Sequence, residues 1–467
     1  MARVALVSML ALFAACHPGN APTASPPSPP PPRRALAASV VSSIDPTHLA
    51  STVARLAAFG TRHTLSDTTS PTRGIGAART WIKAQLDAAA EGAGPDRAMD
   101  VSFDRHVQRA DGKRVPRDTE VVNVMAVLAG AMPEARARRY YIVGHYDSRT
   151  TDVMDAASDA PGANDDASGV AVVIELARVM AHARFDATLV FLATAGEEQG
   201  LVGAKLHAEE ARANGWDVRA VLNDDIVGDP SPLGAGVARD REIRVFSEGI
   251  PLIATGDGDA GAVNEIRKLG AENDSASREL ARFVADVAAD EQTRVQPLLV
   301  FRPDRFLRGG DHLAFAELGF TAVRFTTVEE HYDRQHQNFS VDDAGLAHGD
   351  VTANVDSAYL AGVAALDGVV LAHLANAPAP PENARVVTAD LANDTLLRWS
   401  SCSEPDVAGY EIVWRATTSA RWENVLDAGA VTEHRLAVNK DDVIFGVRAY
   451  DREGWRSPVT FARAAAK

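Results

Sequence analysis

The chain has 467 residues, of which 46% are hydrophobic, and a formal net charge of −16. This length predicts two or three domains, and the hydrophobic content excludes a chain that is disordered throughout. An acidic protein repels the phosphate groups of nucleic acids, so we expect no nucleic-acid partner.

The first 16 residues carry one arginine and then an apolar run that ends in small residues before Cys16. The run is too short to cross a membrane as a helix, so we predict a signal peptide over residues 1–16. The residues FAAC at 13–16 resemble a lipobox, the signal for cleavage before a cysteine that is then lipidated, although Phe13 stands where leucine is usual. Ordinary signal cleavage is the alternative. In both cases we expect an exported protein, which is secreted or is held in the periplasm or at the outer membrane by a lipid on Cys16.

Proline-rich segments divide the rest of the chain. Residues 17–38 contain PTASPPSPPPPRR, which predicts an extended linker that cannot bury a core. A second break, NAPAPP, begins at residue 376. We therefore predict a globular domain over residues 39–376 and a smaller domain over residues 377–467.

Strands and helices alternate in the first of these domains. Apolar, β-branched segments predict strands, and amphipathic segments predict helices. The predicted strands cover residues 120–128, 139–143, 187–194, 218–222, 296–301 and 320–325. The predicted helices cover residues 49–59, 76–89, 165–183, 201–214, 275–290, 311–318 and 355–375. This alternation predicts an α/β fold with a mixed, centrally parallel sheet flanked by helices.

The smaller domain consists of short strand-like segments separated by turn signals. They cover residues 396–399, 410–415, 433–438 and 444–450 and predict a small all-β sandwich. Trp399, Tyr410 and the segment FGVRAYDREGWRSP resemble a fibronectin type III domain. Val443 departs from that family, which usually places a corner tyrosine there. We expect either an accessory module for surface or partner contact or a stabilising appendage.

Four predicted strands of the first domain lead directly into polar residues. GHYDS begins at residue 144, AGEE at 195 and NDD at 223, and a loop with two histidines follows the strand at 320–325. Because the carboxyl ends of parallel strands meet at one edge of a sheet, we expect these groups to lie close together. A glycine-bounded turn, GANDDASG at 162–169, adds two adjacent carboxylates before a helix. Acidic capping of that helix is the alternative interpretation of the turn.

The residue types at this edge suit a metal, because imidazole and carboxylate groups are ligands that zinc prefers. The residues alone leave three choices of ligand open. These are Asp165 or Asp166 in the turn, Asp224 or Asp225 after the fourth predicted strand, and His331 or His336 in the last loop.

A family resemblance decides between these choices. The motifs GHYDS, PGANDDASG, AGEEQGLVGA, NDDIVGD, NDSASRELA and EHYDRQHQ follow one another over about residues 48–375. They resemble the co-catalytic zinc aminopeptidase family, secreted exopeptidases related to glutaminyl cyclase and glutamate carboxypeptidase. The resemblance implies two zinc ions per chain, with manganese or cobalt as alternative metals. The implied ligands are His145, Asp165 and Asp225 for one ion, and Asp165, Glu198 and His336 for the other.

The resemblance also implies the remaining catalytic roles. Glu197 would be the general base that takes a proton from the attacking water and returns it to the leaving amine. Asp147 would accept a hydrogen bond from the His145 ring and fix its tautomer. Asp311 and His312 match the family as well, but helix capping and structural hydrogen bonding fit them equally well. Thr327 departs from the family, in which glutamate is frequent at this position.

We therefore expect a metallo-aminopeptidase that hydrolyses peptides with a free N-terminus. A carboxypeptidase or dipeptidase of the same fold is one alternative, in which the basic run Arg302, Arg305 and Arg308 would hold a substrate carboxylate. A catalytically inactive adhesion or scaffold protein is the other alternative, and a retained pair of zinc ions with turnover would exclude it.

Overall fold

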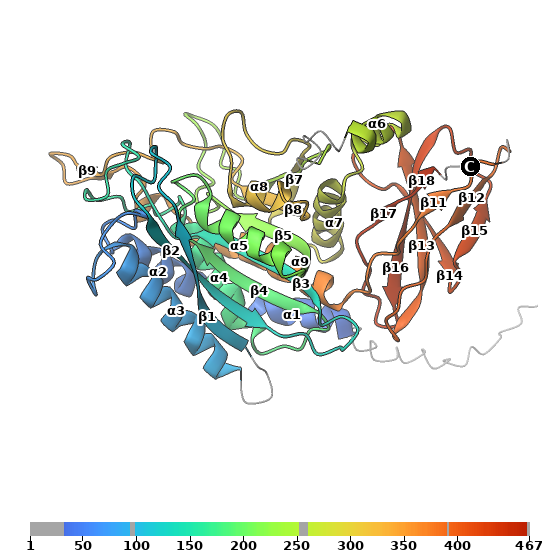
Figure 1. Cartoon of the computed structure of the whole chain (residues 1–467), viewed down its shortest axis with the longest axis horizontal. Helices are drawn as coiled ribbons and strands as arrows, with labels where there is room; N and C mark the ends of the chain where they lie inside the picture. Colours follow the sequence, from blue (N-terminus) through green and yellow to red (C-terminus); the bar gives the residue numbers. More distant parts are fainter. Residues whose placement is uncertain (1–31, 94–98, 252–259, 390–391, 465–467) are drawn as a thin grey trace, which may run out of the picture.

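The computed structural model describes residues 32–93, 99–251, 260–389 and 392–464 (Figure 1). The predicted signal peptide and Cys16 lie outside these residues. The described chain forms an α/β domain and a β domain, each with its own hydrophobic core, which lie side by side in Figure 1.

A mixed eight-stranded sheet forms the centre of the α/β domain. Its strands are β1 (Met99–Gln108), β2 (Thr119–Leu128), β3 (Arg138–His145), β4 (Thr188–Thr194), β5 (Asp217–Asp224), β6 (Glu242–Phe246), β7 (Gln296–Val300) and β8 (Ala322–Thr326). Their order in the sheet is β1-β2-β4-β3-β5-β8-β6-β7. The central strands β4, β3, β5 and β8 run parallel, whereas β1, β2 and β6 pair antiparallel with their neighbours β2, β4 and β8. The predicted α/β fold with a centrally parallel sheet is thus confirmed.

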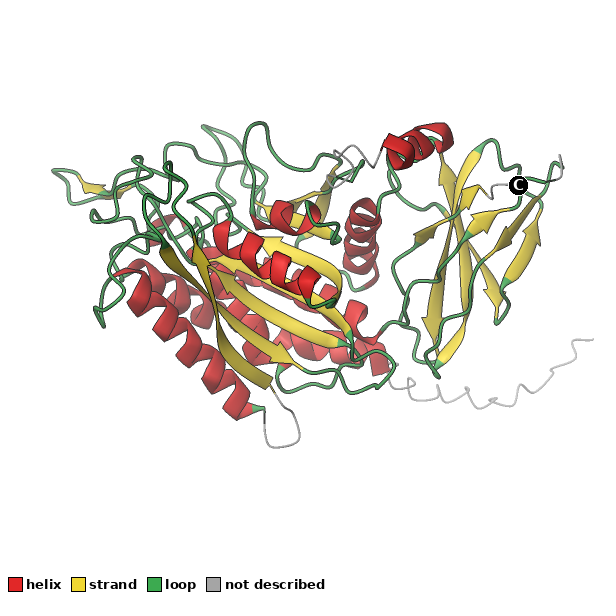
Figure 2. Ribbon diagram, viewed as in Figure 1, coloured by secondary structure: helices red, strands yellow, loops and turns green. Residues whose placement is uncertain are grey.

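Helices cover both faces of this sheet (Figure 2). The helices are α1 (Pro32–Ser43), α2 (Pro46–Ala57), α3 (Gly74–Gly92), α4 (Ala167–Met180), α5 (Val202–Ala213), α6 (Ala260–Leu269), α7 (Ala276–Asp290), α8 (Asp311–Ala316) and α9 (Ser357–Asn376). Side chains of α2, α3, α4 and α9 share one core with Tyr140 and Ile142 of β3. Those of α5 and α8 share a second core with Tyr141 and Val143. Successive side chains of a strand point to opposite faces, so β3 is buried on both sides and its sequence reads as continuously apolar.

The helix α9 has an unusual combination of length and apolar composition. It is long and apolar enough to cross a membrane, but 89% of its most apolar window is buried inside the protein. A helix surrounded by protein on all sides is apolar on all sides, so this composition reflects its position in the core.

Several parts of the α/β domain differ from the prediction, which did not include the strand β6 or the helix α6. The helix α1 begins at Pro32, so residues 32–38 of the predicted extended linker are helical, and Ala37 is buried in the core. Proline suits the first turn of a helix because that turn does not need its N–H group. The strand β1 was not predicted, although it pairs with β2 over its whole length. As the edge strand it is only partly buried and carries many polar side chains, which hides the strand signal.

The β domain is an antiparallel two-sheet arrangement with one parallel pair. Its strands are β11 (Arg385–Val386), β12 (Thr395–Arg398), β13 (Val407–Ala416), β14 (Asn424–Gly429), β15 (Glu433–Leu436), β16 (Val443–Asp451), β17 (Thr460–Phe461) and β18 (Arg463–Ala464). They form sheets of order β15-β12-β11-β18 and β14-β13-β16-β17. Trp399 and Tyr410 pack in the core between them, with ring centroids 5.7 Å apart. The predicted all-β sandwich is present, and the relation to fibronectin type III domains stays a prediction.

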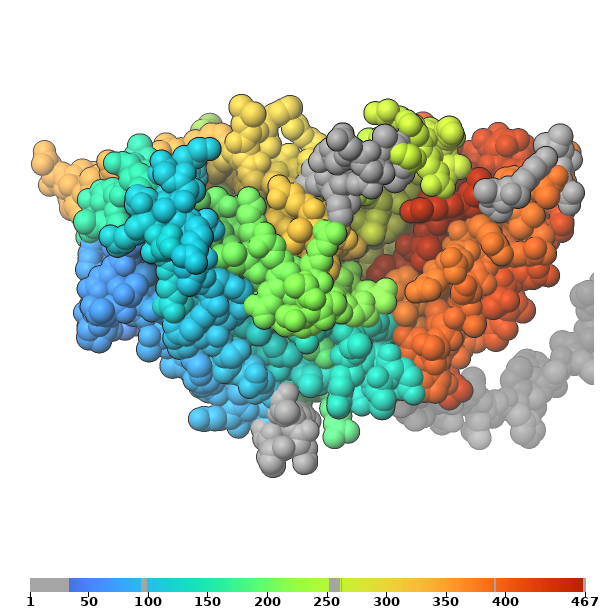
Figure 3. Space-filling model, viewed as in Figure 1, coloured from blue at the N-terminus to red at the C-terminus, as the bar shows by residue number. Residues whose placement is uncertain are grey.

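The β domain docks on the α/β domain through buried polar contacts. In Figure 3 its orange and red atoms lie directly against the rest of the chain. Arg138, the first residue of β3, lies 3.1 Å from the Glu404 carboxylate of the β domain, and both side chains are buried. On α7, the Glu279 carboxylate accepts a hydrogen bond from the Trp422 indole at 2.9 Å, and the Arg282 guanidinium donates to the Ala420 carbonyl at 2.8 Å.

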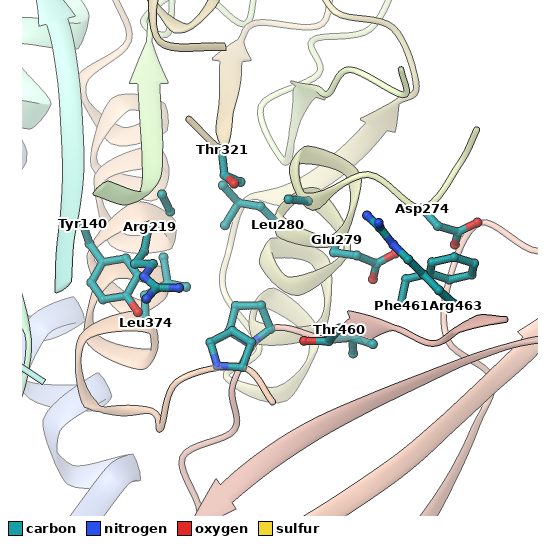
Figure 4. Close-up of a pocket in the computed structure, with 15 residues that line it drawn as sticks. Tyr140, Arg219, Asp274, Glu279, Leu280, Thr321, Leu374, Thr460, Phe461 and Arg463 are labelled. Carbon is teal, nitrogen blue, oxygen red and sulfur yellow. The ribbon is translucent and has the colours of Figure 1, made fainter. Parts of the chain in front are cut away.

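A cavity of about 280 Å³ remains between the two domains (Figure 4). Tyr140, Ala220 and Thr321 line it from the amino-terminal parts of β3 and β5 and from just before β8, and Phe461 lines it from the β domain. The β domain therefore covers the amino-terminal edge of the parallel strands, which is opposite to the edge where the predicted metal ligands emerge.

Carboxylates gather at another part of this interface. Burial, together with the carboxylates of Asp406, Asp451 and Glu453 of the β domain, raises the pKa of Asp186 to about 6, although Arg138 opposes this shift. A raised pKa means that the folded state holds this proton more tightly than the unfolded state. The resulting stabilisation is complete below about pH 4 and is lost as the pH rises through 6.

The Arg138–Glu404 pair gives a first prediction. Arg138→Ala should lower the free energy of unfolding by about 3–5 kcal/mol, because it leaves the buried Glu404 carboxylate without its cationic partner and with only the Ala379 N–H group as a donor. Urea unfolding followed by fluorescence would measure the loss. Arg398→Ala is the matched control: Arg398 pairs with Glu433 at 2.9 Å, but their side chains are 47% and 60% exposed, so the loss should stay below about 1 kcal/mol. Equal losses in the two variants would contradict the proposed importance of the buried pair.

The carboxylates around Asp186 give a second prediction. Asp186→Asn should raise the free energy of unfolding by about 1 kcal/mol at pH 8, a value reduced for the partial exposure of the side chain, and should have no effect at pH 4. Unfolding would be measured at both pH values on chelator-treated protein, so that metal loss does not contribute. Asp100→Asn, at an exposed position of β1, is the control and should be neutral at both. An equal effect of Asp186→Asn at both pH values would show that the raised pKa is not the cause.

Candidate metal centre

His145 is the last residue of β3 and faces two carboxylates. Its Nδ1 atom lies 3.2 Å from the Asp147 backbone carbonyl, which can only accept, so Nδ1 donates and Nε2 keeps a free lone pair. The Nε2 atom lies 3.1 Å from Asp165 Oδ1 and 3.9 Å from Asp225 Oδ1. Asp165 comes from the turn before α4, and Asp225 directly follows β5.

A second group of ligands shares Asp165 with the first. His336 Nε2 lies 2.9 Å from Asp165 Oδ2 and 3.0 Å from Glu198 Oε1. Within each group of three residues the ligand atoms lie within 4.8 Å of one another. The structure thus brings together all five side chains that the sequence suggested as metal ligands, with Asp165 between the other four.

The chemistry of these groups fits divalent cations. His145 Nε2 and Glu198 Oε1 are buried and have no hydrogen-bond partner among the described residues. Three buried ligand carboxylates and two imidazoles would carry uncompensated negative charge, whose burial is costly unless cations balance it. Nitrogen and oxygen ligands without a thiolate match zinc. The residues present therefore fit two metal ions that share the Asp165 carboxylate.

Asp166 holds the turn and does not face the ligand groups. Its carboxylate accepts hydrogen bonds from the backbone N–H groups of His145 at 3.1 Å and Gly169 at 2.9 Å, and it is the N-cap of α4. The peptide bond between Asp165 and Asp166 is cis. A Cβ atom on Gly169 would lie 2.4 Å from the Asp224 carbonyl oxygen, so only glycine allows this helix start to approach β5 so closely. The choice of Asp165 rather than Asp166 agrees with this geometry.

The other two open choices also agree with the geometry. Asp224 points away from the ligand groups into the core, where its neighbour is Asp367 of α9, and burial raises the pKa of Asp224 well above its usual value. His331 Nε2 lies 3.0 Å from the carbonyl of Ser231, which belongs to the loop after β5, and His331 is not part of either ligand group. His336 has a left-handed backbone with φ of 56°. Such strain in a non-glycine residue costs about 1–3 kcal/mol and is concentrated at functional sites.

Asp147 and Glu197 occupy positions next to the ligands. The Asp147 carboxylate accepts hydrogen bonds from the backbone N–H groups of Glu197 at 3.2 Å and Glu198 at 3.1 Å, and lies 3.5 Å from His145 Nδ1. It therefore positions the Glu197–Glu198 pair as well as the histidine. Burial raises the pKa of Glu197 well above its usual value; His145 opposes this shift, and Glu198 adds to it.

Several residues that the sequence singled out have structural contacts instead. The Asp311 carboxylate accepts a hydrogen bond from the Thr194 hydroxyl, and His312 Nε2 donates a hydrogen bond to the Pro303 carbonyl at 2.8 Å. Thr327 is buried, and its N–H donates to the Ile226 carbonyl at 2.9 Å. The Arg302 guanidinium stacks on Phe306, 3.5 Å from the ring centroid.

Two residues that fix the ligand side chains in place were not predicted from the sequence. Arg324 of β8 is fully buried, and its Nη2 atom lies 2.9 Å from Asp225 Oδ1. Asp350 accepts hydrogen bonds from the N–H groups of Asn164 at 2.8 Å and Asp165 at 2.7 Å. The signal for Arg324 was present in the sequence, because an arginine inside the apolar run of a central strand needs a buried partner.

A cavity of about 580 Å³ opens onto the ligand groups. Asp165, Glu198, Asp225 and His336 line it together with Glu197. A substrate in this cavity would reach both ligand groups and the Glu197 carboxylate at once.

Comparison with known proteins agrees with this arrangement. Residues 123–247 match the family model described as peptidase family M28. The chain is 42% identical over 424 residues to a probable zinc metalloprotease of Leptosphaeria maculans, covering 91% of this chain and 96% of that protein. It is 43% identical over 428 residues to a probable zinc metalloprotease of Pyricularia oryzae, covering 90% of this chain and 83% of that protein.

Solved structures share the fold. The crystal structure of LapB from Legionella pneumophila superposes with a TM-score of 0.51 at 18% identity, covering 73% of this chain and 75% of that chain. LapA aminopeptidase from the same organism gives a TM-score of 0.50 at 17% identity, covering 75% of this chain and 76% of that chain.

The fold and the carboxylate–imidazole groups at the carboxyl ends of its parallel strands define a zinc metallopeptidase. The chain is also similar to a relative along nearly the whole length of both chains, and part of it matches a family model. It therefore belongs to peptidase family M28.

Proposed function

We propose that the protein is an exported aminopeptidase that uses two zinc ions to release N-terminal residues from peptides. The observation that carries the proposal is the pair of ligand groups that share Asp165 and open into one cavity with Glu197. The description of LapA as an aminopeptidase is consistent with it. Export rests on the sequence of residues 1–16, and tethering by a lipid on Cys16 is part of the proposal.

The chain's own residues would divide the chemistry as follows. His145, Asp165 and Asp225 would hold one ion, and Asp165, Glu198 and His336 the other. Bound zinc ions supply Lewis acidity and lower the pKa of water, so that hydrolysis proceeds near neutral pH.

Glu197 would move the proton. Its backbone is held by Asp147, and its carboxylate lines the cavity, so it can take a proton from the attacking water. The same carboxyl group can then donate this proton to the leaving amine, which balances the reaction.

The metal centre gives a third prediction. Wild-type protein should retain about two zinc ions per chain after dialysis, and His336→Ala should retain about one, because one group loses a ligand. Elemental analysis would measure the ratio. His331→Ala is the matched control, since His331 lies five residues away in the same loop but outside the ligand groups. Equal metal content in both variants would exclude His336 as a ligand.

The proposed base gives a fourth prediction. Glu197→Gln should reduce kcat by about 10²–10⁴-fold and leave the zinc content unchanged, because the amide cannot accept the proton. Activity would be measured on aminoacyl chromogenic substrates with and without chelator. Glu209→Gln, at an exposed position of α5, should keep full activity. Full activity of Glu197→Gln would refute the mechanism, and a zinc-loaded wild type without activity on any peptide would favour the inactive scaffold.

A carboxypeptidase or dipeptidase is the second candidate. Arg305 and Arg308, two of the three arginines in the predicted basic run, line the same cavity as the ligand groups. Cleavage of amine-blocked peptides with free carboxyl ends, but not of carboxyl-blocked peptides with free amines, would favour this candidate over the first.

A further inference from the structure

Among the described residues, five arginine and lysine side chains line the cavity above the metal centre, although the protein as a whole is acidic. We call them the cationic collar; they are Arg114, Arg149, Lys205, Arg305 and Arg308. They come from four separate segments: the β1–β2 loop, the loop after β3, the helix α5 and the loop between β7 and α8. Separate segments of a chain with net charge −16 thus contribute positive charge to one place.

Arg305 anchors one side of the collar. Its guanidinium lies 3.0 Å from the Asp304 carboxylate and 2.5 Å from the Glu330 carboxylate, and it also donates to the Gly309 carbonyl at 2.9 Å. Only 8% of its side chain is exposed. Arg305 is therefore held in one position before any substrate arrives.

Arg308 and Lys205 are freer to bind a ligand. Arg308 shares the Glu330 carboxylate at 3.0 Å with Arg305 and Arg244, so one carboxylate serves three guanidinium groups. It also donates to Gln335 Oε1 at 3.1 Å, so two of its five N–H groups have acceptors among the described residues. The Lys205 ammonium group has no hydrogen bond or ion pair with any described residue. These two side chains keep donors available to the cavity.

The acidic groups of the cavity do not cancel the positive charge of the collar. The described acidic residues that line it are Asp165, Glu197, Glu198 and Asp225, which are the proposed zinc ligands and the proposed base. With two divalent cations bound, their negative charge is balanced at the metal centre. The remaining charge of the cavity is that of the collar, which is positive.

From this charge distribution we infer that the cavity binds peptides that carry a carboxylate close to the scissile bond. Arg308 and Lys205 donate hydrogen bonds to this carboxylate, and the positive charge of Arg305, whose guanidinium is held in one position, attracts it. The inference rests on the proposed function, because it takes the cavity as the peptide site. The carboxylate is either the C-terminal one of a very short peptide or that of an aspartate or glutamate side chain.

The test compares two pairs of peptides on the zinc-loaded full chain. Ala-Ala and Ala-Ala-amide differ in the C-terminal carboxylate, and Ala-Glu-amide and Ala-Gln-amide differ in a side-chain carboxylate. A charge-assisted hydrogen bond should make kcat/KM about 10-fold higher for the carboxylate member of a pair, mainly through KM. The advantage should shrink at high salt. The pair that shows it identifies the source of the carboxylate.

Two variants connect this preference to the collar. Lys205→Gln and Arg308→Gln should each lower the preference about three- to tenfold, again through KM and with little change in kcat. Arg212→Gln is the matched control, because Arg212 lies on the same helix as Lys205, about 10 Å along it and outside the cavity. It should leave the preference unchanged.

The outcomes separate this inference from the proposed function. Equal turnover of both members in both pairs would overturn the inference and leave the proposed peptidase standing. Calorimetric binding of the same peptides to zinc-loaded Glu197→Gln does not depend on turnover. Preferential binding of the carboxylate members there, with no turnover by wild type, would support the inference and refute the proposed peptidase. Equal binding of all four peptides would overturn the inference.

Discussion

Negative charge buried at the carboxyl edge of the central sheet is the constraint on which the rest of the site depends. Acidic side chains surround His145 on several sides, from the segments after β3, β4 and β5, from the turn before α4, and from α8. They are Asp147, Asp165, Asp166, Glu197, Glu198, Asp225 and Asp311. Backbone N–H groups satisfy Asp147 and Asp166, and Arg324 neutralises part of the charge at Asp225. The remaining charge needs cations, and bound zinc would therefore stabilise the fold of this edge as well as supply its chemistry.

The same constraint explains why the ligands are held so firmly. Asp350 accepts a hydrogen bond from the Asp165 N–H group and so fixes that residue. Asp166, the N-cap of α4, accepts a hydrogen bond from the N–H group of His145 at the end of β3. Ile226, next to Asp225, has a left-handed backbone with φ of 64°, as His336 has at the opposite ligand group. Several kcal/mol of backbone strain at ligand-bearing segments can persist only where the surrounding contacts fix them. These contacts restrict the ligand-bearing segments, which reduces the ordering cost of binding a metal.

The sequence predicted the α/β fold and the meeting of the ligand residues because buried parallel strands read as continuous apolar runs, and their polar successors must share one edge. It missed β1, whose partly exposed edge position gives a mixed pattern, and α1, whose proline-rich start resembles a linker. It missed Arg324 and Asp350 for a different reason: their importance lies in pairing across the fold with residues 99 and 185 positions away. The cationic collar was visible only in part, since Arg114, Arg149 and Lys205 lie in unrelated segments that the fold alone brings to Arg305 and Arg308.

The strand β3 connects the docked β domain with the metal centre. Its first residue, Arg138, is buried against Glu404 and the Ala377 carbonyl, where the β domain covers the amino-terminal edge of the sheet. Its last residue is His145, at the metal centre. The β domain and the cavity lie at opposite edges of the sheet, and β3 is a central strand that runs from one edge to the other. The contacts of Arg138 with the β domain therefore hold β3 at one end, and the ligand group of His145 lies at the other.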